Sequence, residues 1–422
     1  MHIAVLALGS RGDVYPLAAL AAELARRGHR IRMGASPNLV DLPRRLGLDV
    51  VPVGWDQQRM MQSEQGREWV TTTDLDLFLR RSHESYQEHG DRFGEEAVAL
   101  SEGCAAIVCA VVSEQWATAL AEARDVPLVA YDLTPARPND VVPHPLVTPD
   151  PLADAAANRA TYVHYARRAW RYRRDQVFRF RRRLGLAPMP PRPATLRRPL
   201  ELQGYSPTLV PGVTWDAYRP IVGDLRLTPA DLHRVGMSTL DPDLVRWLDA
   251  GEPPALVTFG STHMPDPAGM LAGIGRVCRA LGVRGLVVTG WGLAGVDPAA
   301  TPELRVLPYV DYDLVLPRCA MVVHHGSATI TAAGVRAGIP TMVCSSFADQ
   351  PFWGRQLERL GAGVHVRFTE LSEQVLRAGM TRLTAEPLRR RAAELGERMR
   401  TEPHGTLVAA DAVGSYLAAC GG

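Results

Sequence analysis

Two histidines, a glycine and a serine stand together at a turn in the C-terminal half of the chain: His324, His325, Gly326 and Ser327. The apolar residues 321–323 before them are mostly β-branched and end at this turn, which is typical of a buried strand. A helix that begins directly after such a turn presents free backbone N–H groups and the positive end of its dipole. The turn therefore suits an anion, and phosphate is the anion that we expect.

The surrounding residues predict the unit that positions this turn. A helix is expected from about Thr329 to Ala337, because Gly338 stands where a helix-terminating glycine belongs and Pro340 prevents continuation. A second apolar run, residues 341–344, completes the strand–turn–helix–strand order that is typical of a parallel sheet. The phosphate turn is therefore predicted at the C-terminal end of a strand in such a sheet.

A second loop that offers polar chemistry follows the first apolar run, residues 3–8, and reads Gly9-Ser10-Arg11-Gly12-Asp13. It differs from the G-x-G-x-x-G pattern of a dinucleotide site, and no acidic residue stands near the end of the next expected strand, residues 31–35, to hold a ribose. Asp13 has two interpretations that spacing leaves open. It caps the following helix, expected over residues 16–27, or it places a carboxylate where ligands of open α/β folds bind.

Length and composition predict two α/β domains. The chain has 422 residues, 46% of them apolar, which is enough for two large cores. Expected strands and helices alternate in both halves, and a proline-rich stretch, residues 185–220, separates them. Because loops of both halves meet at strand ends, we expect an inter-domain cleft. Residues 55–100 break the alternation with a polar insertion, either a substrate-facing wall or a long excursion, that carries Trp55, Met60, Met61 and Trp69.

Composition also limits the partners and the compartment. The formal net charge of +2 does not indicate a nucleic-acid partner. No apolar run has the length of a membrane span and the first residues lack a basic signal region, so we expect a cytoplasmic protein without stable membrane insertion. The six cysteines form no C-x-x-C pair, which favours buried free thiols over a zinc site. An arginine-rich amphipathic pattern, residues 158–183, fits a solvated helix face, with membrane docking and an acidic acceptor as alternatives.

Five short motifs occur in a characteristic order along the chain: Gly9-Ser10-Arg11-Gly12-Asp13-Val14, Gly204-Tyr205-Ser206-Pro207, Phe259-Gly260-Ser261, His324-His325-Gly326-Ser327-Ala328 and Ala348-Asp349-Gln350-Pro351-Phe352. In this order and spacing they resemble the nucleotide-sugar glycosyltransferases of GT-B fold that decorate natural products. That family includes glycopeptide-antibiotic glucosyltransferases and sterol-type enzymes. The resemblance spans essentially the whole chain, and the combination of motifs is highly specific.

The resemblance implies an α/β protein with two facing Rossmann-like domains. An acceptor-binding domain would comprise residues 1–205, a linker residues 206–230, and a nucleotide-sugar-binding domain residues 231–404. A last helix, residues 405–422, would return to the N-terminal domain. Whether the chain forms a homodimer is left open.

The implied reaction is an inverting, metal-independent displacement at the anomeric carbon of a hexose or deoxysugar, with no cofactor. The donor would be a TDP- or UDP-sugar, and the acceptor a small natural-product aglycone. Family members carry a histidine or aspartate base at the position that Asp13 occupies in Gly12-Asp13-Val14-Tyr15-Pro16, so Asp13 is the expected general base.

The resemblance also assigns contacts to the donor. His324 matches the histidine that contacts the diphosphate, whereas His325 is on the other strand face and is expected to be structural. The other expected diphosphate contacts are Gly326, Ser327, Thr329, Ser261, Ser10 and Arg11. The backbone of Val310 matches the nucleobase contact, and Trp291 is either a stacking wall or packing. Asp349 and Gln350 match the pair that binds donor-sugar hydroxyls, with capping of the helix at Pro351 as the alternative.

The phosphate turn departs from the family pattern H-H-G-G/S-A-G-T. Thr329 replaces a glycine, which restricts the backbone, and Ile330 replaces a threonine that commonly touches phosphate. Thr329 or Thr331 is the expected substitute for that hydroxyl. These departures keep open, beside the transferase, a catalytically weak homologue that acts as an auxiliary partner in a glycosylation complex. A sugar-nucleotide epimerase of the same fold is a third and lesser alternative, because the N-terminal loop resembles the transferases better.

Overall fold

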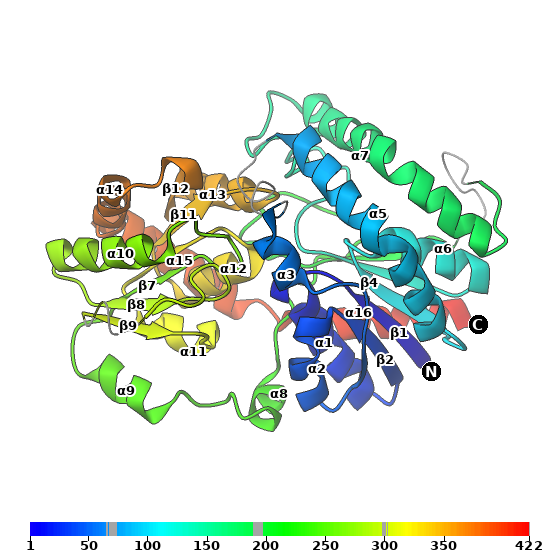
Figure 1. Ribbon diagram of the computed structural model, residues 1–422, viewed down its shortest axis with the longest axis horizontal. Coiled ribbons are helices and arrows are strands. Elements are labelled where there is room, and N and C mark those ends of the chain that lie inside the picture. The colour runs from blue at the N-terminus through cyan, green and yellow to red at the C-terminus, as the bar shows by residue number, and fades with distance from the viewer. Residues whose placement is uncertain (65, 67–73, 189–196, 298–300, 302, 422) are drawn as a thin grey trace.

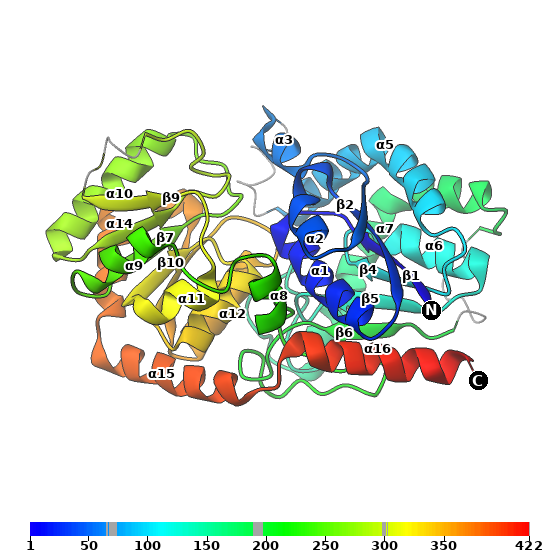
Figure 2. The ribbon, with the colours of Figure 1, turned by 90° about the horizontal axis from the view of Figure 1, so that it is seen from below.

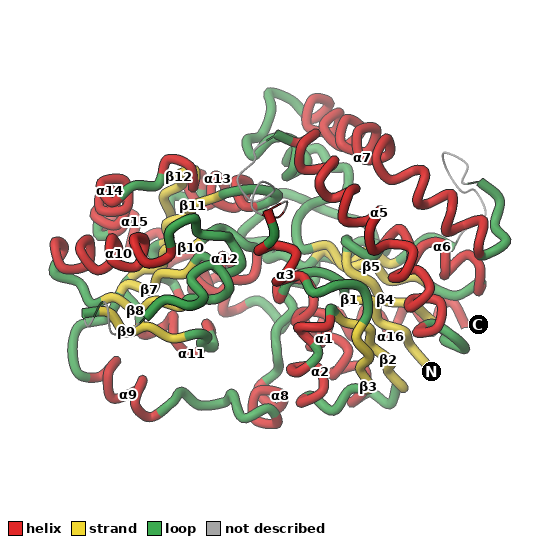
Figure 3. The backbone as a smooth tube through the Cα atoms, in the orientation of Figure 1, coloured by secondary structure: helices red, strands yellow, loops and turns green. Residues whose placement is uncertain are grey.

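The protein contains two parallel β-sheets of six strands each, as seen in a computed structural model that describes residues 1–64, 66, 74–188, 197–297, 301 and 303–421 (Figure 1, Figure 3). Trp69 lies outside the described residues. The strands of the first sheet are β1 (His2–Ala7), β2 (Arg30–Ala35), β3 (Asp49–Pro52), β4 (Ala106–Ala110), β5 (Leu128–Asp132) and β6 (Leu200–Gln203). Those of the second are β7 (Ala255–Thr258), β8 (Gly285–Val288), β9 (Leu304–Leu307), β10 (Met321–His324), β11 (Thr341–Ser345) and β12 (Gly363–Arg367).

The two sheets have the same topology. The first has the strand order β3-β2-β1-β4-β5-β6, and the second, β9-β8-β7-β10-β11-β12, repeats it. This order is that of the Rossmann fold. All strands stay parallel, and the direction in which successive strands are added to the sheet reverses between the two central strands. The reversals lie between β1 and β4 and between β7 and β10, and the expected α/β architecture with two Rossmann-like domains is confirmed.

Helices cover both faces of each sheet, and side-chain alternation along the strands explains why. In β1, Ile3 and Val5 point into one buried cluster while Ala4 and Leu6 point into another. A strand that is buried on both faces reads as a continuous apolar run, which is why the central strands were predictable. The helices of the N-terminal half are α1 (Arg11–Arg26), α2 (Asp41–Arg45), α3 (Gln57–Gln62), α5 (Leu75–Leu100), α6 (Glu114–Arg124) and α7 (Ala155–Arg183).

The second sheet is enclosed in the same way. Helices α10 and α14 pack on one of its faces, while α9, α11 and α12 pack on the other. The remaining helices of the chain are α8 (Pro229–Arg234), α9 (Pro242–Asp249), α10 (Pro267–Leu281), α11 (Tyr312–Val315), α12 (Ala328–Ala337), α13 (Gln350–Arg359), α14 (Glu373–Leu383), α15 (Glu386–Thr401) and α16 (Gly405–Gly421). Short 3₁₀ turns occur at Pro37–Leu39, Leu316–Arg318 and Phe368–Glu370. All six cysteines are free thiols and five are buried, as expected.

Two features of the fold differ from the sequence-based expectation. Helix α1 begins at Arg11 rather than at Pro16, which lies inside it. Pro16 has no N–H to donate to the Gly12 carbonyl, and the hydrogen bonds between Ser10 and Asp13 stabilise the earlier start. Strands β3, β6 and β12 were not predicted. All three are edge strands, and β6 lies inside the proline-rich stretch.

The last helix connects the two halves. Helix α15 lies on the C-terminal domain and α16 continues along α1 of the N-terminal domain (Figure 2). Ala409, Val413 and Leu417 of α16 are buried in the core cluster beside α1, and Asp411 pairs with Arg27 at 2.6 Å. The chain therefore crosses between the domains twice.

Candidate active site

The cleft forms where loops from both sheets leave the C-terminal ends of the central strands, which is where open α/β sheets bind ligands. After β1 comes Gly9, and after β7 comes Gly260, both with positive φ values of 134° and 56°. A Cβ atom at Gly9 would collide with the Asp13 carboxylate, and one at Gly260 with the His325 ring. Glycine is therefore required at both positions, because it permits the turn and the close approach of a polar side chain.

The cleft has two compartments that meet at a shared wall. The compartment on the linker side has a volume of about 230 Å³ and contains Arg11, Trp291 and Tyr309. The other has a volume of about 370 Å³ and contains Asp13, Asp349 and Gln350. Six residues line both compartments: Ser10, Gly12, Ser261, His325, Ser327 and Thr329. The structure thus brings the loops of the two domains to one junction, with Asp13 and Asp349 on its larger-compartment side.

Asp13 lies at this junction, in the larger compartment. Its Oδ2 accepts hydrogen bonds from the backbone N–H of Ser10 at 2.8 Å and from the Ser10 hydroxyl at 3.0 Å. Burial raises the pKa of Asp13 above its usual value, and the two hydrogen bonds from Ser10 oppose that rise. Both interpretations of Asp13 therefore apply to its position: it stabilises the start of α1, and its carboxylate borders the cleft.

The two histidines of the phosphate turn lie opposite to the prediction. His324, which we expected at the cleft, is fully buried at the end of β10 and lines neither compartment. His325, which we expected to be structural, lines both. The two side chains do lie on opposite strand faces, but the face toward the cleft is the one that carries His325, because its ring packs over the Gly260 turn.

Both imidazoles are neutral at pH 7. Burial lowers the pKa of His325 to about 4 and that of His324 well below 6.5. Nδ1 of His324 accepts a hydrogen bond from the N–H of Gly326 at 2.9 Å, so its proton resides on Nε2. Among the described residues, that Nε2 has no hydrogen-bond partner. At the cleft, His325 can therefore offer a hydrogen bond to an anion but no charge, so positive charge has to come from elsewhere.

The N-terminus of α12 supplies part of that positive potential. Ser327 is its N-cap residue and its hydroxyl makes no capping hydrogen bond, which leaves it available to a ligand. Thr329 faces Gly12 of the other domain, whereas Thr331 is buried and its hydroxyl donates to the Ser327 carbonyl at 2.8 Å. Thr329 is thus the threonine hydroxyl at the cleft, and Thr331 is not. Gly326 lines neither compartment, and the side chain of Ile330 packs in the core.

Arg11 supplies a cation at the cleft. It lines the smaller compartment, and its guanidinium lies 5.9 Å from the ring centroid of Tyr15 and 5.3 Å from that of Tyr309. Tyr309 comes from the C-terminal domain, so this cation–π pair spans the cleft. No ion pair of Arg11 with a carboxylate occurs in the part of the chain that the structure describes.

The expected nucleobase contacts lie around the smaller compartment. Trp291 lines it and also packs against the core of the N-terminal domain. The Val310 side chain is buried in the core of the C-terminal domain, and its neighbours Tyr309 and Asp311 line the compartment. Tyr309 was missed in the sequence, although an aromatic residue that follows a strand end at a cleft is a signal that could have found it.

Asp349 and Gln350 lie in the larger compartment at the start of α13. Oδ2 of Asp349 accepts a hydrogen bond from the indole N–H of Trp353 at 2.9 Å, and burial raises the pKa of Asp349 to about 6. Oε1 of Gln350 accepts from the N–H of Ser346 at 2.8 Å, which ties down its own loop. Ala348 in that loop has a φ of 55°, a left-handed conformation that is strained for alanine. Asp349 is thus a fixed carboxylate at the cleft.

Comparison with known proteins places the chain in a family. The description "Glycosyltransferase family 28 N-terminal domain" matches residues 3–141, and "Erythromycin biosynthesis protein CIII-like, C-terminal domain" matches residues 295–414. The uncharacterized glycosyltransferase Rv1524 of Mycobacterium tuberculosis is 30% identical over 419 residues, which are 97% of each chain. The chain belongs to the glycosyltransferases.

More distant relatives agree with this assignment. Sterol 3-beta-glucosyltransferase UGT80A2 of Arabidopsis thaliana is 30% identical over 376 residues, which cover 86% of this glycosyltransferase and 57% of the plant protein. The fold is that of the calicheamicin glycosyltransferase CalG4, with a TM-score of 0.67, 19% identity and coverage of 99% and 98% of the two chains. VinC, solved in complex with dTDP, has a TM-score of 0.67 at 16% identity, with 98% of each chain covered. These structures confirm the GT-B fold.

The glycosyltransferase contains three Asp-x-Asp sequences, a pattern that can bind metal ions. In each of them the first aspartate caps a helix: Asp74, Asp241 and Asp311 accept hydrogen bonds from the backbone N–H groups two and three residues later. Across the described residues, no group of three or more histidine, cysteine or acidic side chains is arranged to hold a metal ion. The same part of the chain contains no helix long and apolar enough to cross a membrane.

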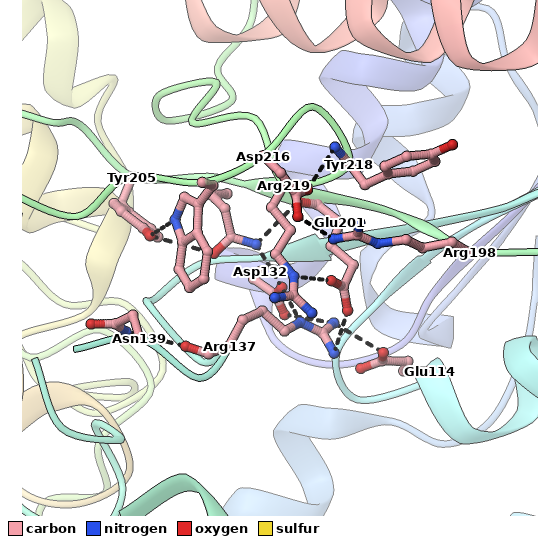
Figure 4. Close-up of polar contacts among 12 residues, drawn as sticks. Glu114, Asp132, Arg137, Asn139, Arg198, Glu201, Tyr205, Asp216, Tyr218 and Arg219 are labelled. Carbon is pink, nitrogen blue, oxygen red and sulfur yellow. Dashed lines mark hydrogen bonds and ion pairs between the residues drawn. The ribbon is translucent and has the colours of Figure 1, made fainter. Parts of the chain in front are cut away.

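An arginine-centred network borders the larger compartment and was not foreseen in the sequence (Figure 4). Arg137 pairs with Asp132 at 2.7 Å, with Glu114 at 2.9 Å and with Glu201 at 3.0 Å. Burial raises the pKa of Asp132 in spite of the neighbouring guanidinium. Glu201 also pairs with Arg219. The network fixes the loop after β5, which forms one wall of the compartment.

Proposed function

We propose that this glycosyltransferase inverts configuration while it transfers a hexose or deoxysugar from a TDP- or UDP-sugar to a hydroxyl group of a small-molecule acceptor, without a metal ion. The observation that carries the proposal is the junction of two compartments, lined on both sides by Ser10, Gly12, Ser261, His325, Ser327 and Thr329. A donor whose nucleotide fills the smaller compartment would place its sugar beside Asp349 and Asp13. An acceptor in the larger compartment would then meet the anomeric carbon at this junction.

The residues of the junction support the chemistry of displacement. Asp13 would take the proton of the acceptor hydroxyl as that oxygen attacks the anomeric carbon. The diphosphate that leaves gains negative charge, and the free N–H groups of α12, the Ser261 and Ser327 hydroxyls and the Arg11 guanidinium would stabilise it. We further propose that the N-terminal domain holds the acceptor and the C-terminal domain the donor. The free thiols favour a reducing compartment such as the cytoplasm.

The first test is a calorimetric titration with TDP and with UDP, followed by mass spectrometry of mixtures of nucleotide-sugars and hydroxylated natural products. Binding of one nucleotide together with a glycoside product supports the transferase. Binding with no glycoside, but with isomerisation of the donor sugar, would support the epimerase instead. If neither nucleotide binds, the proposed donor compartment is wrong and an auxiliary role becomes the better hypothesis.

His325→Ala is expected to weaken nucleotide diphosphate binding by about tenfold, because one hydrogen bond to a charged phosphate oxygen is lost. The thermal unfolding midpoint should change little, since His325 makes no hydrogen bond within the described structure that an alanine would remove.

His324→Ala is the matched variant. It removes the acceptor of the Gly326 N–H in a fully buried position, so its main effect should be a lower unfolding midpoint. The opposite result is that His324→Ala loses nucleotide affinity at an unchanged unfolding midpoint while His325→Ala binds the nucleotide normally. That result would show that His324 contacts the phosphates.

A further inference from the structure

Arg173 of α7 reaches the larger compartment without a carboxylate partner. It lines that compartment, and its one hydrogen bond among the described residues goes from Nη2 to the Tyr165 hydroxyl, at a long 3.5 Å. A guanidinium has five N–H donors, so most of those of Arg173 are unused. It forms no ion pair within 4.0 Å in the part of the chain that the structure describes.

The second arginine of the compartment provides the contrast. Arg137 is surrounded by Asp132, Glu114 and Glu201, so its charge is more than balanced (Figure 4). Glu114 is also near enough to Arg173 to interact through the field, but its ion pair is with Arg137. The carboxylates at this end of the compartment are thus engaged by Arg137, and Arg173 is left as the cation that faces the cavity.

The neighbours of Arg173 show the sign of the local potential. His144 stacks on Tyr165 with ring centroids 3.8 Å apart and lines the same compartment. Burial, and then the charges of Arg173 and Arg137, lower the pKa of His144 to about 3, so it adds no charge at pH 7. A cation in a partly desolvated cavity is unfavourable unless a partner compensates it, and a bound ligand is the partner that the compartment can accommodate.

The compartment also has a group of large apolar side chains. Trp55, Met60, Met61, Phe78, Tyr86 and Leu146 line it, and they come from the polar insertion, α5 and the loop before α7. Methionine and aromatic side chains adapt to flat or irregular apolar molecules. A ligand that fits therefore has an apolar body together with a group that can pair with a guanidinium.

We propose that Arg173 binds an anionic oxygen group, a carboxylate or an oxyacid ester, on the acceptor. Arg173 is then a specificity-determining residue: the acceptor hydroxyl lies at the junction beside Asp13, and the anionic group lies at the opposite, α7 side of the compartment. The assignment of this ligand as an acceptor rests on the proposed function. The anion site itself does not, because it stands on the contacts of Arg173 alone.

The test uses two fluorescent probes with the same aromatic framework, 8-anilinonaphthalene-1-sulfonate and the uncharged N-phenyl-1-naphthylamine. The wild-type protein should bind the sulfonate more tightly than the amine. Arg173→Met should lower the affinity for the sulfonate by about tenfold or more and leave that for the amine unchanged. Arg173→Lys should retain part of the preference.

Arg174→Met is the matched control, because Arg174 is the next residue of α7, is exposed and pairs with Asp175. It should behave like the wild type. Three results would each overturn the proposal. The wild type shows no preference for the sulfonate, Arg173→Met loses affinity for both probes equally, or Arg173→Met keeps the full preference for the sulfonate. If the protein shows the Arg173-dependent preference for the sulfonate but binds neither TDP nor UDP, the proposed function is wrong and the anion site is still supported.

Discussion

Replacing Asp13 with asparagine is expected to lower kcat for sugar transfer by about 10²–10⁴, because a positioned general base contributes a factor of this size. Nucleotide binding should remain unchanged, since Asp13 lines only the larger compartment. Asparagine keeps an oxygen that can accept the N–H of Ser10, so the start of α1 should survive. Single-turnover kinetics with one donor and one acceptor measure the effect without a contribution from product release.

The pH profile gives an independent readout of the same group. Burial raises the pKa of Asp13 above its usual value, and only the ionised carboxylate accepts a proton. Activity should therefore be lost as the pH falls through that raised pKa, and the Asp13→Asn variant should lack this limb. Asp13→Ala serves as the structural control, because it removes the capping oxygen as well. Wild-type turnover in Asp13→Asn would assign the base to another carboxylate, of which Asp349 and Glu114 line the same compartment.

The sequence allowed the central part of the fold to be predicted because its strands are buried on both faces. Such strands read as apolar runs, and glycine and proline mark the helix ends between them. The edge strands β6 and β12 lack this pattern: in β6, Leu200 and Leu202 alternate with Glu201 and Gln203, and in β12, valines alternate with His365 and Arg367. These segments are strands because they pair with the neighbouring strands β5 and β11, and their own residues do not indicate it.

Side-chain directions at the site were harder to predict. Strand periodicity correctly placed His324 and His325 on opposite faces, but it gives no information about which face meets the other domain. That depends on how the Gly260 turn approaches His325, a contact between residues 65 positions apart in the sequence. The motif assigned the phosphate turn to the cleft, and only the packing around it could show which imidazole lines the cleft.

The acceptor side was not predictable from the sequence. Arg137, Arg173 and Glu114 come from a loop, from α7 and from α6, and none of them belongs to a recognisable motif. Residues 158–183 contain ten arginines, and only the three-dimensional contacts show that Arg173 faces the cavity while Arg168 and Arg181 pair with Asp76 and Glu122. Which arginine pairs with which carboxylate is decided by the fold. An interpretation based on composition therefore cannot distinguish among the ten arginines.

Asp349→Asn is expected to separate function from stability. If Asp349 accepts a hydrogen bond from a donor-sugar hydroxyl, loss of its charge should lower kcat/KM by about 10², since hydrogen bonds to charged groups contribute about 3 kcal/mol at most. The same change should raise the unfolding midpoint at pH 8. Burial raises the pKa of Asp349 from 3.8 to about 6, so the ionised form is less favourable in the folded protein than in the unfolded chain.

The sign of this linkage predicts how the difference depends on pH. Below about pH 4 the wild-type carboxyl is protonated in both states, and wild type and variant should unfold at similar temperatures. As the pH rises toward 6 the unfolded chain releases the proton first, so the wild type loses stability relative to the variant, and the gap becomes constant above that range.

Trp353→Phe tests the positioning of the same carboxylate without removing its charge. The indole N–H that Asp349 accepts at 2.9 Å holds the pKa of Asp349 lower than burial alone would. Its loss should raise that pKa further and move the acidic limb of the activity profile to higher pH. Midpoints of Asp349→Asn that match the wild type from pH 4 to pH 8 would show that the Asp349 carboxylate is not desolvated. Full activity of that variant would remove Asp349 from the donor-sugar site.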